Sequence, residues 1–267
     1  MSERAPLLEA FDLRKSFAAS SGPVGATGRR TMAVDGVTFA VLPGETLGVV
    51  GESGCGKTTL ARMVLRLIEP DSGEIKLRGE DWRGAKGEKL RSLRRRMQMV
   101  FQDPVASLNP RMRVGTIVSE PLAIHEPGLS RAERREKAAE ILQSVGLGSE
   151  ALDRYPHEFS GGQRQRIGIA RALILRPQLV IADEPVSALD VSIGAQILEL
   201  LEKLRREFSL TLILISHSLP VVAQLADRIA VMRSGKIVEM GAAERVLCSP
   251  REEYTKALIA AVPQIPS

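Results

Sequence analysis

The chain has 267 residues, 44% of them hydrophobic, so it can bury a sizeable core and lies near the upper limit for one domain with a subdomain. No run of about 18 apolar residues occurs, so no membrane span is expected, and the first residues lack the pattern of a secretory signal. We therefore expect a single cytoplasmic domain over residues 1–267. Cys55 and Cys248 are too few for a disulfide scaffold and form no CxxC metal site.

The net charge is +5, which on its own would suit a polyanionic partner. The basic residues of segments 91–96 and 131–137 fall in stretches with helical periodicity, however, and in the second they alternate with glutamates. Aromatic residues make up only 3% of the chain, which leaves few platforms for stacking bases. We favour solvated helix faces over a nucleic-acid footprint, and expect no nucleic acid as a partner.

The first part of the chain alternates apolar and polar residues over 8–17 and 36–42, which predicts two strands. Segment 18–30, rich in Ser, Gly and Arg, predicts a loop between them. A buried strand over 46–50 then runs directly into a glycine-rich turn, and residues 57–68 have the apolar spacing of a helix. This strand, loop, helix order is the one that a phosphate-binding loop requires.

The middle of the chain, residues 104–176, is predicted to be mostly helical. Helices are expected over 114–124 and 130–145, the second opened by Ser130 and Glu133 as a capping box, and a third follows.

The last part returns to alternating strands and helices. Apolar runs over 179–182 and 210–215 have the character of strands buried in a parallel sheet, and a helix over 193–208 separates them. Residues 228–238 predict a hairpin, and residues 254–261 a short helix.

A phosphate-binding loop is the first chemical motif, because residues 51–58 fit the pattern GxxxxGK[ST] without mismatch. Its glycines let backbone N–H groups and a helix N-terminus face the phosphates. Lys57 supplies a charge for the β- and γ-phosphates, and the Thr58 hydroxyl is suited to hold Mg²⁺. The residues expected to bind ATP here are Gly51, Ser53, Gly54, Cys55, Gly56, Lys57, Thr58 and Thr59.

An acidic pair follows the apolar run 179–182. Asp183, at the end of a buried strand, is expected to reach Mg²⁺, and Glu184 to polarise the attacking water as a general base. The alternative is structural, with a helix-capping aspartate and a surface glutamate before Pro185.

The sequence Ser160-Gly161-Gly162-Gln163 opens a helix. Ser160 as N-cap and two glycines that expose backbone donors would make a second anion-binding turn. Together with the phosphate loop and the acidic pair, this turn resembles the signature of the ATP-binding cassette (ABC) family, which faces the γ-phosphate bound by the opposite subunit. The resemblance implies an α/β fold: a P-loop NTPase core (ABC nucleotide-binding domain) with an antiparallel β subdomain and a helical signature subdomain.

The resemblance covers nearly the whole chain and implies a division of it. Residues 1–103 and 177–250 would form the core with the β subdomain, residues 104–176 the helical subdomain, and residues 251–267 a short C-terminal tail.

Further residues match the family pattern one by one. Gln102 resembles the glutamine that contacts Mg²⁺ or the lytic water, and His217 the histidine that contacts the γ-phosphate. Residues 187–190 resemble the loop that joins the two ATP sites of a dimer, with Asp190 as its acidic member. Phe17 resembles the aromatic residue that stacks on adenine, a core phenylalanine being the alternative. The resemblance thus implies Glu184, His217, Lys57 and Gln102 as catalytic residues, and Thr58, Gln102 and Asp183 as metal ligands.

Two positions depart from the family pattern. Phe159 precedes the signature where leucine is frequent, and Ser218 follows His217 where an acidic residue is usual. Glu184 is retained, so we expect a site that hydrolyses ATP.

The branch of the family is indicated by residues 101–112, 51–56, 33–37 and 254–258, which resemble the ATPases of oligopeptide, dipeptide and nickel importers. This implies an ATPase that energises solute transport from the cytoplasmic face of the inner membrane. Its expected partners are integral membrane subunits, a second ABC ATPase as homodimer or heterodimer, and indirectly a solute-binding protein. The alternatives are a soluble ABC ATPase acting on nucleic acid or ribosomes, and a regulatory module without turnover.

Cys55 gives one hypothesis particular to this chain. It lies beside a helix N-terminus and Lys57, both of which favour a thiolate, so an alkylating agent should inhibit the ATPase and ATP should protect it. A small buried residue chosen for its fit is the alternative.

Overall fold

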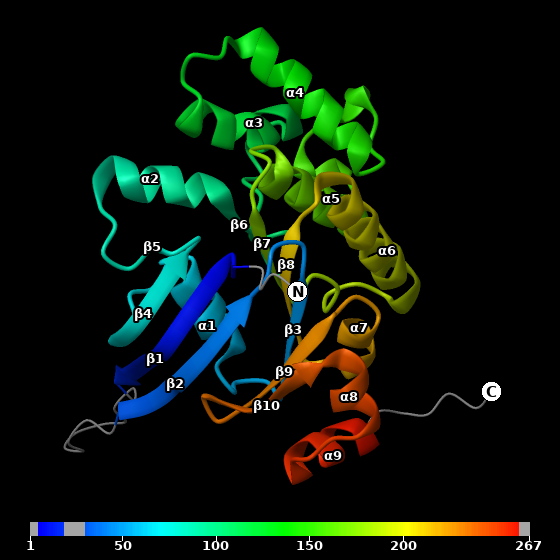
Figure 1. Ribbon diagram of the computed structural model, residues 1–267. Coiled ribbons are helices and arrows are strands. Elements are labelled where there is room, and N and C mark those ends of the chain that lie inside the picture. Colours follow the sequence, from blue (N-terminus) through cyan, green and yellow to red (C-terminus); the bar gives the residue numbers. More distant parts are fainter. Residues whose placement is uncertain (1–4, 19–29, 262–267) are drawn as a thin grey trace, which may run out of the picture. The chain divides into compact units, whose positions relative to one another are not determined.

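The computed structural model describes residues 5–18 and 30–261 (Figure 1). It divides into two compact units, the first made of residues 1–85 and 215–267 and the second of residues 86–214, in each case as far as they are described. We treat the two units separately.

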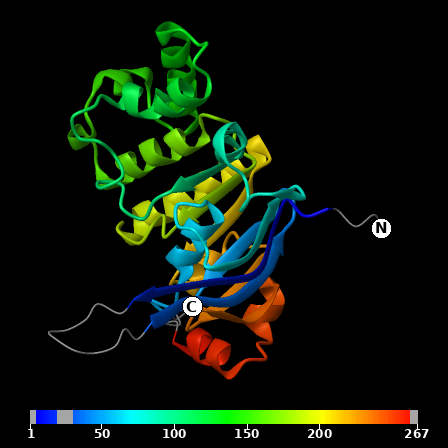
Figure 2. The same ribbon diagram turned by 90° about the vertical axis from the view of Figure 1, so that its left-hand side faces the viewer.

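The first unit contains an antiparallel sheet with the strand order β2-β1-β4-β5. Its strands are β1 (Leu8–Ala18), β2 (Arg30–Val41), β4 (Ser72–Leu77) and β5 (Glu80–Asp81). Leu8 lies opposite Val41 on one side and Leu77 on the other, and all three are buried. Figure 2 shows β1 and β2, in blue, running side by side along their length. This is the expected β subdomain.

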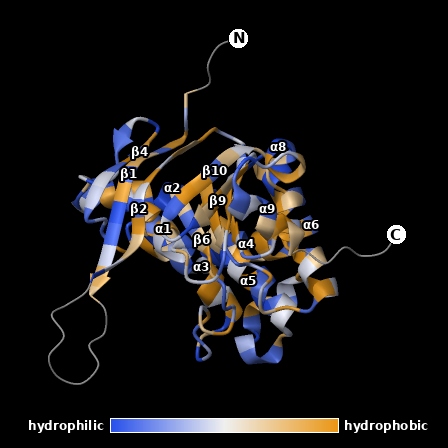
Figure 3. Cartoon of the chain, turned by 90° about the horizontal axis from the view of Figure 1, so that it is seen from below, coloured by the Kyte–Doolittle hydropathy of each residue, from blue (hydrophilic) through white to orange (hydrophobic). Residues whose placement is uncertain are grey.

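The same unit holds the strand that leads into the phosphate loop. This strand, β3 (Thr46–Val50), is buried at every residue and pairs in parallel with β9 (Arg228–Arg233), which pairs antiparallel with β10 (Lys236–Ala242). In Figure 3 β9 has the colours of hydrophobic residues, in keeping with its buried interior. The helices of the unit are α1 (Lys57–Val64), α7 (Leu219–Ala223), α8 (Ala243–Cys248) and α9 (Glu253–Ala260).

The second unit has parallel strands and most of the helices. Strand β6 (Met97–Val100) pairs in parallel with β7 (Leu179–Asp183), and residues 211–214 of β8 (Thr211–Ser216) belong to the same unit. Its helices are α2 (Gly87–Arg96), α3 (Val114–His125), α4 (Arg131–Ser144), α5 (Gly161–Leu173) and α6 (Val191–Phe208), with 3-10 turns η1 (Ser149–Asp153) and η2 (Pro156–Glu158). The helical character predicted for residues 104–176 is what the structure shows.

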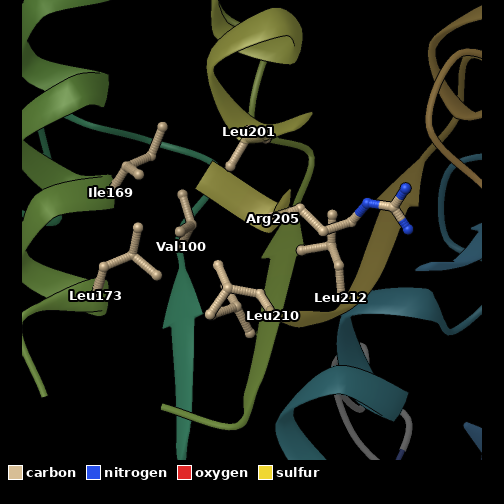
Figure 4. A pocket seen from close by; sticks show the side chains of 8 residues that line it. Val100, Ile169, Leu173, Leu201, Arg205, Leu210 and Leu212 are labelled. Carbon is tan, nitrogen blue, oxygen red and sulfur yellow. The ribbon is translucent and has the colours of Figure 1, made fainter. Parts of the chain in front are cut away.

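The core of the second unit lies where α5 and α6 meet the strands. Figure 4 shows side chains from α5, such as Ile169 and Leu173, facing Val100 of β6 and Leu201 of α6. They line an apolar cavity of about 10 Å³, to which Arg205 contributes the aliphatic stem of its side chain while its guanidinium points away. A space of this size holds at most a single water molecule, so the packing is close to complete.

Several element boundaries differ from those expected, and three of the differences have a clear local cause. Helix α1 ends at Val64 instead of residue 68, because Arg66 takes a left-handed conformation (φ 49°) and the N–H of Leu67 turns back to the carbonyl of Arg62 at 2.8 Å. Strand β2 begins at Arg30, which pairs with Ala18, so these two residues belong to strands. The rest of the predicted loop, residues 19–29, lies outside the described residues. Helix α6 begins at Val191, two residues before the expected 193, because Asp190 caps it.

Candidate functional site

The phosphate loop, residues 51–58, connects β3 to α1 in the first unit. Its glycines allow close backbone approach: a Cβ atom on Gly56 would lie 2.0 Å from the carbonyl oxygen of Ala33, and one on Gly51 would lie 2.1 Å from that of Met232. Gly56 also has a φ of 108°, which a side chain disfavours. The loop is therefore pressed against β2 and β9, and no other residue type fits these two positions without moving backbone.

Lys57 closes the loop from inside. Its side chain is almost fully buried, and its Nζ donates to the carbonyl oxygens of Gly51 at 2.7 Å and Glu52 at 2.8 Å. These bonds hold the ammonium group against the chain of the loop at the N-terminus of α1, where Gly56 as N-cap has no side chain to satisfy the first N–H groups. Positive charge and backbone donors are thus concentrated at one place, which is suited to a polyphosphate. Thr58 and Thr59 lie in the first turn of α1, and Ser53 and Gly54 are exposed.

The burial of Cys55 contradicts the hypothesis of a reactive thiolate at this position. Its Sγ lies 3.8 Å from Lys57 Nζ, but the residue is buried, and burial raises the pKa of the thiol by more than the nearby lysine lowers it. The thiol is therefore neutral at physiological pH, and the expectation of a thiolate at this position was wrong.

Phe17 lies near the end of β1 and is 42% exposed, so the alternative of a core phenylalanine does not hold. The preceding residues are fastened to Asp71, whose carboxylate accepts from Lys15 Nζ at 2.9 Å and from both the N–H and hydroxyl of Ser16 at 2.8 Å. These hydrogen bonds, that of Lys15 foremost, hold the pKa of the Asp71 carboxyl well below its usual range. An aromatic face next to a fixed strand end is suited to stack on a nucleobase.

His217 follows β8 and is exposed. The residue after it, Ser218, donates its N–H to the hydroxyl of Ser216 at 2.9 Å, so a local turn shapes the chain around the histidine. In the ABC family pattern an acidic residue usually follows the histidine, and here Ser218 has that position.

The acidic pair lies in the second unit. Asp183 ends β7 and is buried, and Glu184 follows with a positive φ of 47°, which is strained for a residue with a side chain. The hydroxyl and the N–H of Ser187 both donate to the carbonyl oxygen of Glu184, at 3.1 and 3.2 Å. The Glu184 carboxylate accepts a hydrogen bond of 3.1 Å from the amide of Gln102. The structure thus brings together two of the proposed catalytic residues, which are 82 positions apart in the chain.

The glycine turn at the start of α5 has the expected capping box. The Ser160 hydroxyl accepts from the N–H of Gln163 at 3.3 Å, and the Gln163 side chain accepts from the N–H of Ser160 at 3.0 Å. Gly161 is exposed, whereas Gly162 is buried, and a Cβ on it would lie 2.4 Å from Cγ2 of Ile193. The prediction that both glycines serve to expose donors is therefore incomplete, since Gly162 also lets α5 approach the first turn of α6.

Asp190 caps α6, because its carboxylate accepts from the N–H of Ile193 at 2.9 Å. The next residue, Val191, is 92% exposed. Ile193 thus contacts both motifs: its N–H donates to Asp190, and its side chain lies against Gly162 of the signature turn. These two contacts hold the motifs in a fixed position relative to each other.

Two contacts to the phosphate loop come from residues that the sequence patterns did not connect with it. The N–H of Gly235 donates to the carbonyl oxygen of Cys55 at 2.9 Å, and the N–H of Glu52 donates to the hydroxyl of Tyr254 at 3.2 Å. No spacing rule links positions so far apart, so the sequence offered no means to find them.

In the described ranges 5–18 and 30–261, no helix combines the length and apolar character needed to cross a membrane. Within the same ranges, no three His, Cys, Asp or Glu residues are arranged to hold a metal ion. This finding does not oppose Mg²⁺, which binds through few protein ligands when phosphate oxygens supply the others.

The α/β fold, the phosphate loop, the acidic strand end and the capped glycine turn together define an ATP-binding cassette. A family model described as "ABC transporter" matches residues 34–187, and the chain belongs to this family. The class expected from the sequence, an ABC ATPase, is confirmed.

Curated relatives agree with the branch expected from residues 101–112. The chain is 51% identical to the oligopeptide transport ATP-binding protein OppF of Salmonella typhimurium, over 98% of this chain and 79% of the relative. It is 52% identical to the oligopeptide transport ATP-binding protein AppF of Bacillus subtilis, over 96% and 78%. It is 49% identical to the dipeptide transport ATP-binding protein DppF of Escherichia coli, over 97% and 77%.

Solved structures confirm the fold class. The ATP-binding cassette MJ0796, in a dimeric post-hydrolysis state with ADP and phosphate, matches with a TM-score of 0.77 and 28% identity, over 88% of this chain and 98% of that chain. The cassette CbiO1 from Clostridium perfringens, part of a transporter complex, matches with a TM-score of 0.76 and 26% identity, over 91% of each chain.

Proposed function

We propose that this chain is the ATP-hydrolysing subunit of a transporter that imports peptides, or nickel or another small solute, through separate membrane subunits. The names of relatives at about half identity support peptides as the solute class. The observation that carries the hydrolytic role is the hydrogen bond from the Gln102 amide to the Glu184 carboxylate. This bond holds the carboxylate expected to act as general base in a defined orientation.

For nucleotide binding, we propose that the phosphate loop and Phe17 act at opposite ends of ATP. The Lys57 ammonium, held by the carbonyls of Gly51 and Glu52, neutralises charge on the β- and γ-phosphates. The exposed ring of Phe17 stacks on adenine. The remaining binding set is the one given by the sequence: Gly51, Ser53, Gly54, Cys55, Gly56, Thr58 and Thr59.

For hydrolysis, we propose that the Glu184 carboxylate orients a water molecule and accepts its proton, while Gln102 keeps the carboxylate in place. His217 contacts the γ-phosphate, and Lys57 stabilises the negative charge that spreads over its oxygens as the bond to the β-phosphate breaks.

Mg²⁺ fits the residues available to it, because the proposed ligands Thr58, Gln102 and Asp183 offer hydroxyl, amide and carboxylate oxygens, the hard donors that this ion prefers. When bound, it would neutralise charge on the β- and γ-phosphates. We propose that these three residues hold the Mg²⁺ ion.

We further propose that the cassette works as a dimer with a second copy or a related ATPase. The turn Ser160-Gly161-Gly162-Gln163 would bind the γ-phosphate held by the opposite subunit, and Asp190 would lie at the junction. The dimeric cassettes among the solved structures support this assembly. Residues 1–103 and 177–250 would serve as the core with its β subdomain, 104–176 as the helical subdomain, and 251–267 as a tail. The site of action would be the cytoplasmic face of the inner membrane, with a solute-binding protein acting indirectly.

Purification of the Glu184→Gln variant from detergent-solubilised membranes with ATP and Mg²⁺ tests this proposal. We expect multi-span membrane subunits and a cassette partner to co-purify, because the variant binds ATP without turnover and keeps the closed assembly. The wild-type chain with ADP is the matched control and should retain less of the second cassette. Recovery only from the soluble fraction, with nucleic acid or ribosomes, would contradict transport and favour a soluble ABC ATPase.

A further inference from the structure

The phosphate loop is held from outside by the C-terminal helix of the first unit. Tyr254, in the first turn of α9, accepts a hydrogen bond of 3.2 Å from the backbone N–H of Glu52. The guanidinium group of Arg233, at the end of β9, lies over the tyrosine ring, 4.8 Å from its centroid. The contact with Arg233 therefore positions the ring, and the hydrogen bond from Glu52 engages the hydroxyl group.

Helix α9 is itself fixed to the sheet. Glu239 of β10 is buried, and its carboxylate accepts from the N–H groups of Arg251 at 3.0 Å and Glu252 at 3.2 Å, at the start of α9. Arg245 lies 3.5 Å from the same carboxylate and balances its charge. A buried carboxylate satisfied in this way anchors the helix firmly, since any shift would leave it without partners.

The peptide group between Gly51 and Glu52 connects this anchor to the site. Its N–H donates to Tyr254, and its carbonyl oxygen, that of Gly51, accepts from Lys57 Nζ at 2.7 Å. A peptide group is planar, so fixing its N–H also fixes the direction of its carbonyl. The hydroxyl of Tyr254 thus limits where the ammonium group of Lys57 can lie.

We propose that Tyr254 is a positioning residue for the phosphate loop, acting on Lys57 through the peptide group between residues 51 and 52. The inference rests on the proposed nucleotide-binding function. Loss of the hydroxyl leaves the peptide group free to rotate, so Lys57 loses one of its carbonyl partners and the loop is less well prepared for the phosphates. Tyr254 itself touches no phosphate in this scheme.

The test compares Tyr254→Phe, which removes only the hydroxyl, with Tyr155→Phe, the same change at the other tyrosine of the chain. We expect Tyr254→Phe to weaken ATP and ADP binding to the purified full chain about three- to tenfold, the effect of one neutral hydrogen bond. In ATPase assays we expect KM to rise by a similar factor while kcat stays within about twofold, because binding is lost equally in the ground and transition states. Tyr155→Phe should leave both values unchanged.

A second variant tests the route of the effect. Glu239→Gln weakens the anchor of α9 without touching the loop, and we expect it to lower ATP affinity in the wild-type background but to add little in the Tyr254→Phe background. Equal ATP affinity of Tyr254→Phe and wild type would overturn the positioning role and leave the proposed function intact. Additive losses in the double variant would also overturn the route through Tyr254. A wild-type chain that binds no ATP would overturn the proposed function and this inference together.

Discussion

Gly162→Ala probes the contact that ties the signature turn to α6. The added Cβ would lie 2.4 Å from Cγ2 of Ile193, whereas a Cβ on the neighbouring Gly161 would meet only Leu189 Cδ2, at 3.4 Å. Both glycines are in the first turn of α5, so the gain in helix propensity, up to about 1 kcal/mol, is similar for the two changes. Overpacking a close contact costs about 1–3 kcal/mol. We therefore expect Gly162→Ala to be less stable than Gly161→Ala by about 1–3 kcal/mol.

Urea unfolding of the two variants, followed by circular dichroism, measures this difference. Ile193→Ala removes the atom that the new methyl group meets, so in that background Gly162→Ala should cost little or nothing. Equal stability of Gly161→Ala and Gly162→Ala in the wild-type background would refute the reasoning. It would mean that Ile193, which is only partly buried, turns aside without cost.

Three further predictions concern other contacts. Because burial raises the pKa of the Cys55 thiol, iodoacetamide at pH 7.5 should label the exposed Cys248 at least about tenfold faster by mass spectrometry, and equal rates would contradict a buried neutral thiol. The lowered pKa of Asp71 means that Asp71→Asn should be less stable than wild type above about pH 4, with a difference that shrinks below this value; thermal unfolding across pH 2–7 measures it. Leu173→Ala, beside the cavity of Figure 4, should cost about 2–5 kcal/mol in urea unfolding, whereas Leu67→Ala at an exposed site should be near neutral.

Features that depend on neighbouring residues could be predicted from the sequence. The capping box of α4 has both expected hydrogen bonds. The N–H of Glu133 donates to the Ser130 hydroxyl at 3.2 Å, and the N–H of Ser130 donates to the Glu133 carboxylate at 2.7 Å. The hairpin of β9 and β10 turns where Ser234 and Gly235 supply positive φ angles. In each case the residues that decide the structure lie within a few positions of each other, so their pattern is visible in the sequence.

Features that depend on distant contacts could not be predicted in this way. The thiol of Cys55 has a lysine and a helix N-terminus beside it in the sequence, and these favour a thiolate. Burial outweighs them in the structure, and no local pattern reports how deeply a loop residue will be covered. The start of β2 at Arg30 likewise follows from pairing with β1, because the segment before residue 36 has no strand periodicity of its own.

The phosphate loop shows why its motif indicates the ligand better than it indicates what supports the site. The motif explains Gly51 and Gly56 by the backbone N–H groups that they offer to phosphate. In this fold the two glycines also leave room for the backbone carbonyl groups of β9 and β2, which lie against the loop. Gly235 and Tyr254 then bond the outer arm of the loop from elements about 180 and 200 residues further along the chain. The motif residues form a preorganised site only when these supports are present. Without them, the conformational entropy lost when a mobile loop becomes ordered would offset the free energy gained from its contacts with phosphate. Variation in ATP affinity among chains with the same motif should therefore be sought in such supporting contacts, of which the hydroxyl of Tyr254 is the one most easily removed alone.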